Sequence, residues 1–168
     1  MELTMKQDNK AQFSVLMDKY DRKVEEDLLQ QEREKDEAEK FWLDFERMRN
    51  EIIRPVMKDI GIMLRERGHG YRISEDESLF DREGQAQEEK ITMSIIPSGI
   101  ESDNTSRISL TATARKKIRL YHDIVCLATD SRESGTIAEF WVDEITSDLI
   151  EDKIMNVLTK VFEPKEDA

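Results

Sequence analysis

Two side chains that could bind a metal or form a catalytic pair, His122 and Cys126, stand four residues apart. On a single strand this separation spans roughly 13 Å at about 3.3 Å per residue, which is too far for shared ligation. The chain holds one cysteine and two histidines, and no carboxylates accompany them at a recognised zinc spacing. We therefore expect no metal site, and we expect Cys126 to be a small core residue between Val125 and Leu127.

The other histidine, His69, lies between two glycines and is followed by Tyr71. This segment joins a predicted helix to a predicted strand. A flexible backbone there could admit a ligand, so His69 and Tyr71 form a possible loop site. The alternative is that glycine simply caps the end of the helix.

A short basic segment interrupts the acidic chain. Its five positive charges, with no acidic residue among them, are Arg107, Arg115, Lys116, Lys117 and Arg119. One hypothesis is a patch for an anionic partner, such as a carboxylate ligand or an acidic helix. The alternatives are that these charges deter pairing of sheet edges or neutralise the acidic residues in segment 75–89. Nucleic acid is not expected as a partner, because the net charge is −12 and only Tyr121 could stack on a base nearby.

Motifs for nucleotide binding and acyl transfer are missing. The sequence contains neither G-x-x-x-x-G-K-[ST] nor G-x-G-x-x-G, and it lacks the nucleophile elbow G-x-S-x-G. No nucleophile, base and oxyanion donor can be assembled from its residues. We expect no cofactor and no catalytic residues, so an enzyme is less favoured than a binding protein.

Composition indicates one core with a charged appendage. The chain has 168 residues, of which 38% are hydrophobic and 38% are charged, so some stretch must carry charge without a core. A single cysteine excludes an internal disulfide, and no apolar run approaches the roughly 18 residues of a membrane span. We expect a cytoplasmic protein that does not associate with membranes.

The appendage is predicted to be a helical arm over residues 1–54. Residues 11–54 contain no glycine or proline, and apolar residues recur at steps of three and four, as in a coiled coil. The positions on this seam that we expect to make contacts are Phe13, Met17, Tyr20, Val24, Leu28, Trp42 and Phe45. Between Leu28 and Trp42, residues 30–40 contain Ala38 as their only apolar residue, so this part of the helix cannot be buried against a core.

Residues 55–168 are predicted to form one α+β domain. Pro55 should kink or break the arm, or open a short helix that ends at Gly68. Beyond Gly70 the hydrophobic period changes to two, which predicts strands at 71–74, 90–96, 107–113, 118–127 and 136–142. Their short links, including a turn at 130–135, predict an antiparallel meander of about five strands, and segment 75–89 is predicted to be a mobile loop. A final helix at 147–162 has an apolar stripe suited to packing on the sheet.

The arm suggests the function. Several large apolar residues in its outer part have no predicted core to cover them, which is unusual for a stable monomer. We expect a non-enzymatic interaction or scaffold protein that forms a homodimer, or docks on a protein partner, through the arm. The alternatives are a small acidic secretion or folding chaperone that binds a client in a helix–sheet groove, and a small-anion sensor or enzyme near the basic hairpin.

Overall fold

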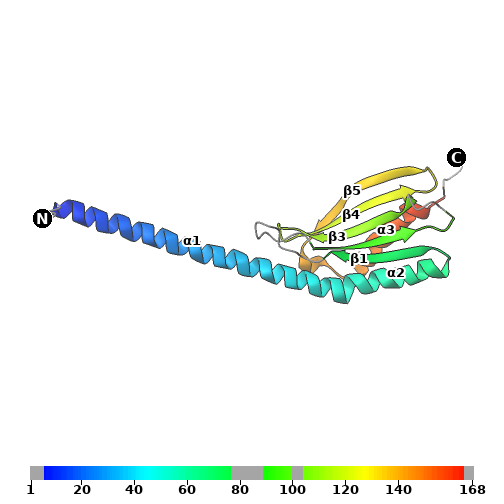
Figure 1. Cartoon of the computed structure of the whole chain (residues 1–168), viewed down its shortest axis with the longest axis horizontal. Helices are drawn as coiled ribbons and strands as arrows, with labels where there is room; N and C mark the ends of the chain where they lie inside the picture. Colours follow the sequence, from blue (N-terminus) through cyan, green and yellow to red (C-terminus); the bar gives the residue numbers. More distant parts are fainter. Residues whose placement is uncertain (1–5, 77–88, 100–103, 165–168) are drawn as a thin grey trace. The chain divides into compact units, whose positions relative to one another are not determined.

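The computed structural model describes residues 6–76, 89–99 and 104–164 (Figure 1). Within these ranges the chain forms a long helix, a five-stranded sheet and a C-terminal helix that packs on the sheet. The predicted α+β class is confirmed. The chain divides into two compact units, residues 1–40 and residues 41–168, and each is described by itself. The division into a coiled-coil-like helical arm, residues 1–54, and an α+β domain with a single core, residues 55–168, stays a prediction.

The first unit contains most of helix α1, Gln7–Met48. From Gln7 to Lys40 its residues are exposed except for Met17 and Ala38, which are half-buried. The segment 30–40, expected to be polar on all sides, therefore packs against no core.

The helical path continues beyond α1 through a change in backbone hydrogen bonding. A π-helical turn, Arg49–Ile53, leads into α2, Arg54–Glu66. Pro55 lies in the first turn of α2, directly after the π-helical turn. At the other end Gly68 adopts a left-handed φ of 88°, and the His69 N–H donates to the Leu64 carbonyl at 3.0 Å. This is the glycine cap that the sequence predicted.

The sheet is a meander in which every neighbouring pair of strands is antiparallel. Its strands are β1 Gly70–Asp76, β2 Glu89–Ile96, β3 Ser106–Ala112, β4 Ile118–Cys126 and β5 Ser131–Phe140. Of the predicted mobile loop 75–89, Glu75 and Asp76 belong to β1 and Glu89 to β2, while residues 77–88 lie outside the described residues.

The predicted turn at 130–135 is wrong, because those residues pair with β4. Ser131 to Gly135 lie opposite Cys126 to His122 in regular register, and the irregularity comes later, next to Leu120 and Tyr121. The connection from β4 is shorter than expected because Asp130 takes a left-handed φ of 53° and the hydroxyls of Thr129 and Ser131 hydrogen-bond at 2.6 Å. A left-handed aspartate can close such a turn without glycine.

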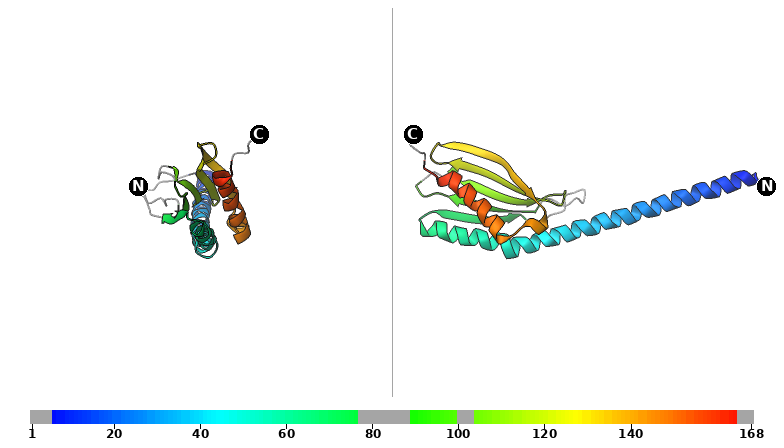
Figure 2. Two further views of the ribbon diagram at one scale, coloured as in Figure 1. Left: turned by 90° about the vertical axis from the view of Figure 1, so that its right-hand side faces the viewer. Right: turned by 180° about the vertical axis from the view of Figure 1, so that it is seen from behind.

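One face of the sheet is covered by helices. Figure 2 shows α2 and α3, Ser147–Phe162, on the same side of the strands. Apolar residues that alternate along β2, β3 and β4 point to that side, and all of the following are buried: Ile91, Met93, Ile95, Ile108, Leu110, Ala112, Ile118, Leu120 and Ile124. Phe41 and Phe45, at the end of α1, are part of the same core. Burial of this apolar surface is the main force that holds helices and sheet together.

Candidate functional site

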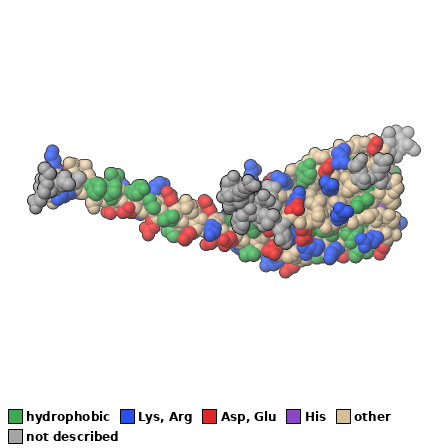
Figure 3. All heavy atoms as spheres, in the orientation of Figure 1, with side chains coloured by type: hydrophobic (Ala, Val, Ile, Leu, Met, Phe, Trp, Pro, Cys, Tyr) green, Lys and Arg blue, Asp and Glu red, His purple; other side chains and the backbone are tan. Residues whose placement is uncertain are grey.

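An apolar stripe lies along the first unit. Phe13, Tyr20 and Leu28 are exposed by 54%, 63% and 57%, values that are high for large apolar side chains. We define the outer stripe as Phe13, Leu16, Met17, Tyr20, Val24 and Leu28. At about 100° of rotation per residue around an α-helix, these side chains fall within a sector of roughly 120°. In Figure 3 hydrophobic side chains gather along this part of α1, with acidic side chains beside them.

The two flanks of the outer stripe differ in charge. The flank that follows Leu28 around the helix carries only acidic charges, from Asp18, Asp21, Glu25 and Glu32. The opposite flank carries Lys19 and Lys23, together with Glu26, while Asp27 lies within the sector of the stripe itself. Lys23 lies 3.9 Å from Asp27, one turn further on. One flank is therefore strongly acidic and the other is mixed.

The remaining residues of the predicted arm seam lie in the second unit. Phe45 is fully buried in the core. Trp42 is partly buried, and its ring centroid lies 5.4 Å from that of Phe41. Of the seven seam residues predicted to make contacts, five lie on the outer stripe and these two pack on the domain.

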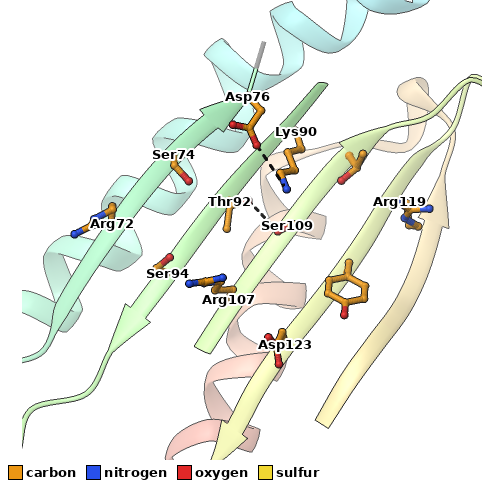
Figure 4. A pocket seen from close by; sticks show the side chains of 12 residues that line it. Arg72, Ser74, Asp76, Lys90, Thr92, Ser94, Arg107, Ser109, Arg119 and Asp123 are labelled. Carbon is orange, nitrogen blue, oxygen red and sulfur yellow. Dashed lines mark hydrogen bonds and ion pairs between the residues drawn. The ribbon is translucent and has the colours of Figure 1, made fainter. Parts of the chain in front are cut away.

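The face of the sheet opposite the helices is polar and hollow (Figure 4). Side chains of this face line a recess of about 490 Å³. The register arranges its lining side chains in rows that cross β1, β2, β3 and β4 in turn. The rows are Arg72, Ser94, Arg107 and Asp123, then Ser74, Thr92, Ser109 and Tyr121, and then Asp76, Lys90, Thr111 and Arg119.

In the last of these rows both cations already interact with other groups of the protein. Lys90 Nζ lies 3.6 Å from Asp76 Oδ2, and Arg119 also has interaction partners of its own. The middle row carries hydroxyl groups only. In it the Thr92 and Ser109 hydroxyls hydrogen-bond at 2.9 Å, and Thr92 is buried.

The first row contains an aspartate whose charge is already satisfied. Asp123 accepts hydrogen bonds from Arg132 Nη1 at 2.7 Å and from the Ser134 hydroxyl at 2.8 Å. Partial burial would raise the pKa of Asp123, but these hydrogen bonds and the positive charges of Arg132 and Arg107 outweigh burial, so its pKa lies below the usual value. By contrast, Arg72 and Arg107 make no hydrogen bond or ion pair within the described part of the chain.

The predicted basic patch is divided between two places. Arg107 and Arg119 line the recess, whereas Arg115, Lys116 and Lys117 lie in the connection between β3 and β4. Lys117 Nζ lies 4.7 Å from the centre of the Trp141 ring, in a cation–π arrangement. Arg72 and Lys90, the other two cations that line the recess, were not among the predicted site residues. They could have been found from the polar residues at alternate positions 72, 74 and 76 of β1 and 90, 92 and 94 of β2, because alternate residues of a strand lie on the same face of a sheet.

The two residues of the predicted loop site contact different helices. His69 Nδ1 accepts a hydrogen bond from the Ser98 N–H at 3.0 Å, and its ring lies 4.9 Å from that of Phe162 on α3. The Tyr71 ring fills the space beside Gly61 on α2, and Arg65 stacks on it at 4.8 Å. In this arrangement both side chains make packing contacts that tie the start of β1 to the helices.

His122 and Cys126 do not form a site together. Both lie on β4, where His122 is buried under α3 and Cys126 is partly buried beside the core. In the described ranges no group of three or more metal-binding side chains comes together. The His122 Nδ1 atom is buried and has no hydrogen-bond partner within the part of the chain that the structure describes.

No protein-family model, curated protein or solved structure matches the chain. Among the residues that the structure describes, no helix is long and apolar enough to span a membrane.

Proposed function

We propose that this chain is a non-enzymatic interaction protein that self-associates through the outer stripe of α1. The observation that carries the proposal is the exposure of this stripe, whose residues have no core of their own unit to pack against. Contiguous apolar surface on one face of a helix is typical of a helix that packs on another helix. The packing partner we propose is the same helix of a second copy.

Charge complementarity supports a parallel pair. In a parallel two-fold pair, opposite flanks of the two stripes meet, so the acidic flank with Asp21 and Glu25 faces the flank with Lys19 and Lys23. In an antiparallel pair, each flank would meet the same flank of the other copy, so the acidic side chains of both copies would face one another. Repulsion between like charges costs free energy and disfavours that arrangement.

The chaperone alternative gains no support from the helix–sheet interface. That interface is filled by buried apolar side chains such as Met57 on α2 and Ile154 on α3. A client peptide would have to displace them, which makes a groove at this place costly.

The experiment compares two valines on opposite sides of the same helix. Val24 lies at the middle of the outer stripe, whereas Val15 points away from it and is 55% exposed. Val24→Asp should weaken self-association by on the order of 3 kcal/mol, or about a hundredfold, because it buries a carboxylate in an apolar seam. Val15→Asp introduces the same charge and should leave association unchanged.

Light scattering after size exclusion measures the result. One chain has a mass of 19.7 kDa. The unmodified protein and Val15→Asp should have twice that mass, while Val24→Asp should have the mass of a single chain. Equal masses for the two variants would contradict the proposal. Circular dichroism of each variant would show whether helix content has changed.

A further inference from the structure

The open face of the sheet holds two arginines that make no hydrogen bond or ion pair with any residue that the structure describes. Arg72 on β1 and Arg107 on β3 flank Ser94 on β2 in one cross-strand row. Neighbouring strands lie about 4.8 Å apart, so the two arginine backbones stand roughly 10 Å apart, with the serine hydroxyl between them. In a chain with 38 acidic residues and 26 basic ones, two exposed arginines on one face that form no ion pair with a described carboxylate need an explanation.

Nearby acidic groups do not supply that partner. Asp123, opposite Arg107 in the register, already accepts hydrogen bonds from Arg132 and Ser134. Asp76 is paired with Lys90. The charge of Arg107 helps to lower the pKa of Asp123, but Arg107 forms no ion pair with it, so no described carboxylate accepts hydrogen bonds from the two guanidinium groups of the first row.

Figure 4 shows how the two arginines lie. The side chain of Arg107 extends toward Ser94, whereas that of Arg72 points away from it, past the edge of β1. An exposed arginine without a partner can change rotamer at little cost, so Arg72 can swing back over Ser94. Arg107 is thus the preformed side of the arrangement and Arg72 the adaptable side.

We propose that this recess binds a phosphate monoester of a small hydroxyl-bearing molecule, such as a sugar phosphate. The phosphate lies over Ser94 and accepts hydrogen bonds from the guanidinium groups of Arg107 and Arg72. Planar guanidinium groups form paired hydrogen bonds to phosphate oxygens, which are stronger than those between neutral groups. The hydroxyl-bearing part lies over the middle row.

The middle row fits that second part of the ligand. Ser74, Thr92 and Ser109 carry hydroxyls, which can donate and accept hydrogen bonds and so match the hydroxyls of a sugar. Tyr121, exposed at the end of the row, offers a flat surface and a further hydroxyl. The recess volume of about 490 Å³ is within the range of small-molecule sites.

The test uses ribose 5-phosphate, inorganic phosphate, ribose and citrate as probes of the intact protein. Titrations followed by amide NMR should show ribose 5-phosphate shifting the signals of Thr92, Ser94 and Ser109. Inorganic phosphate should bind the same place more weakly, because it cannot reach the middle row. Ribose and citrate should cause no shifts there at about 10 mM, where a ligand with a millimolar Kd is largely bound.

Matched arginine variants identify the anchor. Arg107→Gln should weaken ribose 5-phosphate binding at least about tenfold, and Arg72→Gln should weaken it less. Arg115→Gln removes the same charge from the turn between β3 and β4, outside the recess, and should change the Kd by less than about twofold. The NMR spectrum of each variant reports whether the fold is retained.

Several results would overturn the proposal. It is wrong if ribose 5-phosphate causes no shifts at about 10 mM, or if Arg107→Gln and Arg115→Gln bind it equally well. Binding of citrate in preference to phosphate would assign the recess to carboxylates. Inorganic phosphate binding as tightly as the ester would remove the role given to the middle row. None of these results bears on self-association through α1.

Discussion

At the scale of single residues, His122 is a titratable side chain that the fold buries. It lies on β4 under α3, and its Nδ1 atom has no hydrogen-bond partner among the described residues. Burial lowers the pKa of His122 below 6.5, and the charge of Lys160 lowers it further, although Glu133 and Asp123 act in the opposite direction. The folded protein therefore keeps this imidazole neutral at a pH where the unfolded chain takes up a proton.

This difference predicts a pH dependence of stability. As the pH falls below about 6.5, the unfolded state binds a proton that the folded state does not, so the free energy of unfolding decreases. Urea unfolding at pH 7.5 and 5.5 measures the change. His122→Gln should show a smaller loss over this interval, which lies above the range where exposed carboxylates titrate. The explanation fails if the variant and the unmodified chain lose stability equally.

At the scale of secondary structure elements, α3 begins with a side-chain cap. The Thr146 hydroxyl accepts a hydrogen bond from the Leu149 N–H at 3.2 Å, and Ile145 and Ile150 on either side are buried. Thr146 is therefore the N-cap of α3, and Ile145 and Ile150 are placed as in a hydrophobic staple. The cap fixes the start of the helix that covers β3 and β4.

Removing the cap should therefore destabilise the domain. Thr146→Ala is expected to lower the free energy of unfolding by about 1 kcal/mol, because the Leu149 N–H loses its acceptor at the end of the helix. Thr159→Ala is the matched control, since its hydroxyl bonds to a carbonyl within α3 and contributes little. Chemical denaturation of both variants gives the two values, and equal losses would argue against a specific role for the cap.

Residue patterns predicted the elements better than the site. Alternation along Ile91, Met93 and Ile95 was enough to predict β2, because a strand with one buried face has a period of two. The same reasoning misplaced the start of β5, since Asp130 closes a turn that usually carries glycine. The recess could not be predicted, because the alignment of Arg72 with Arg107 depends on the register across β2, which the sequence of either strand does not fix.

At the scale of the whole molecule, apolar residues are distributed unequally. Among the described residues, all members of the buried core lie between Phe41 and Val161, so the second unit has a complete hydrophobic core of its own. The outer stripe lies in the first unit, where it covers no core. A second copy of the stripe would supply the missing partner, which makes self-association the central proposal for this chain.

Disulfide cross-linking tests that proposal most directly, because it reports which residues of two copies meet. With Cys126 replaced by serine, cysteine would be introduced singly at Phe13, at Val24 or, as a control facing away, at Val15. A disulfide forms only where two Cα atoms come within about 7 Å. We predict that, on mild oxidation, Phe13→Cys and Val24→Cys will each form a disulfide-linked dimer, while Val15→Cys will stay a single chain. Cross-linking only in a mixture of the first two would indicate an antiparallel pair. Failure of both, or equal cross-linking of Val15→Cys, would contradict self-association through the outer stripe.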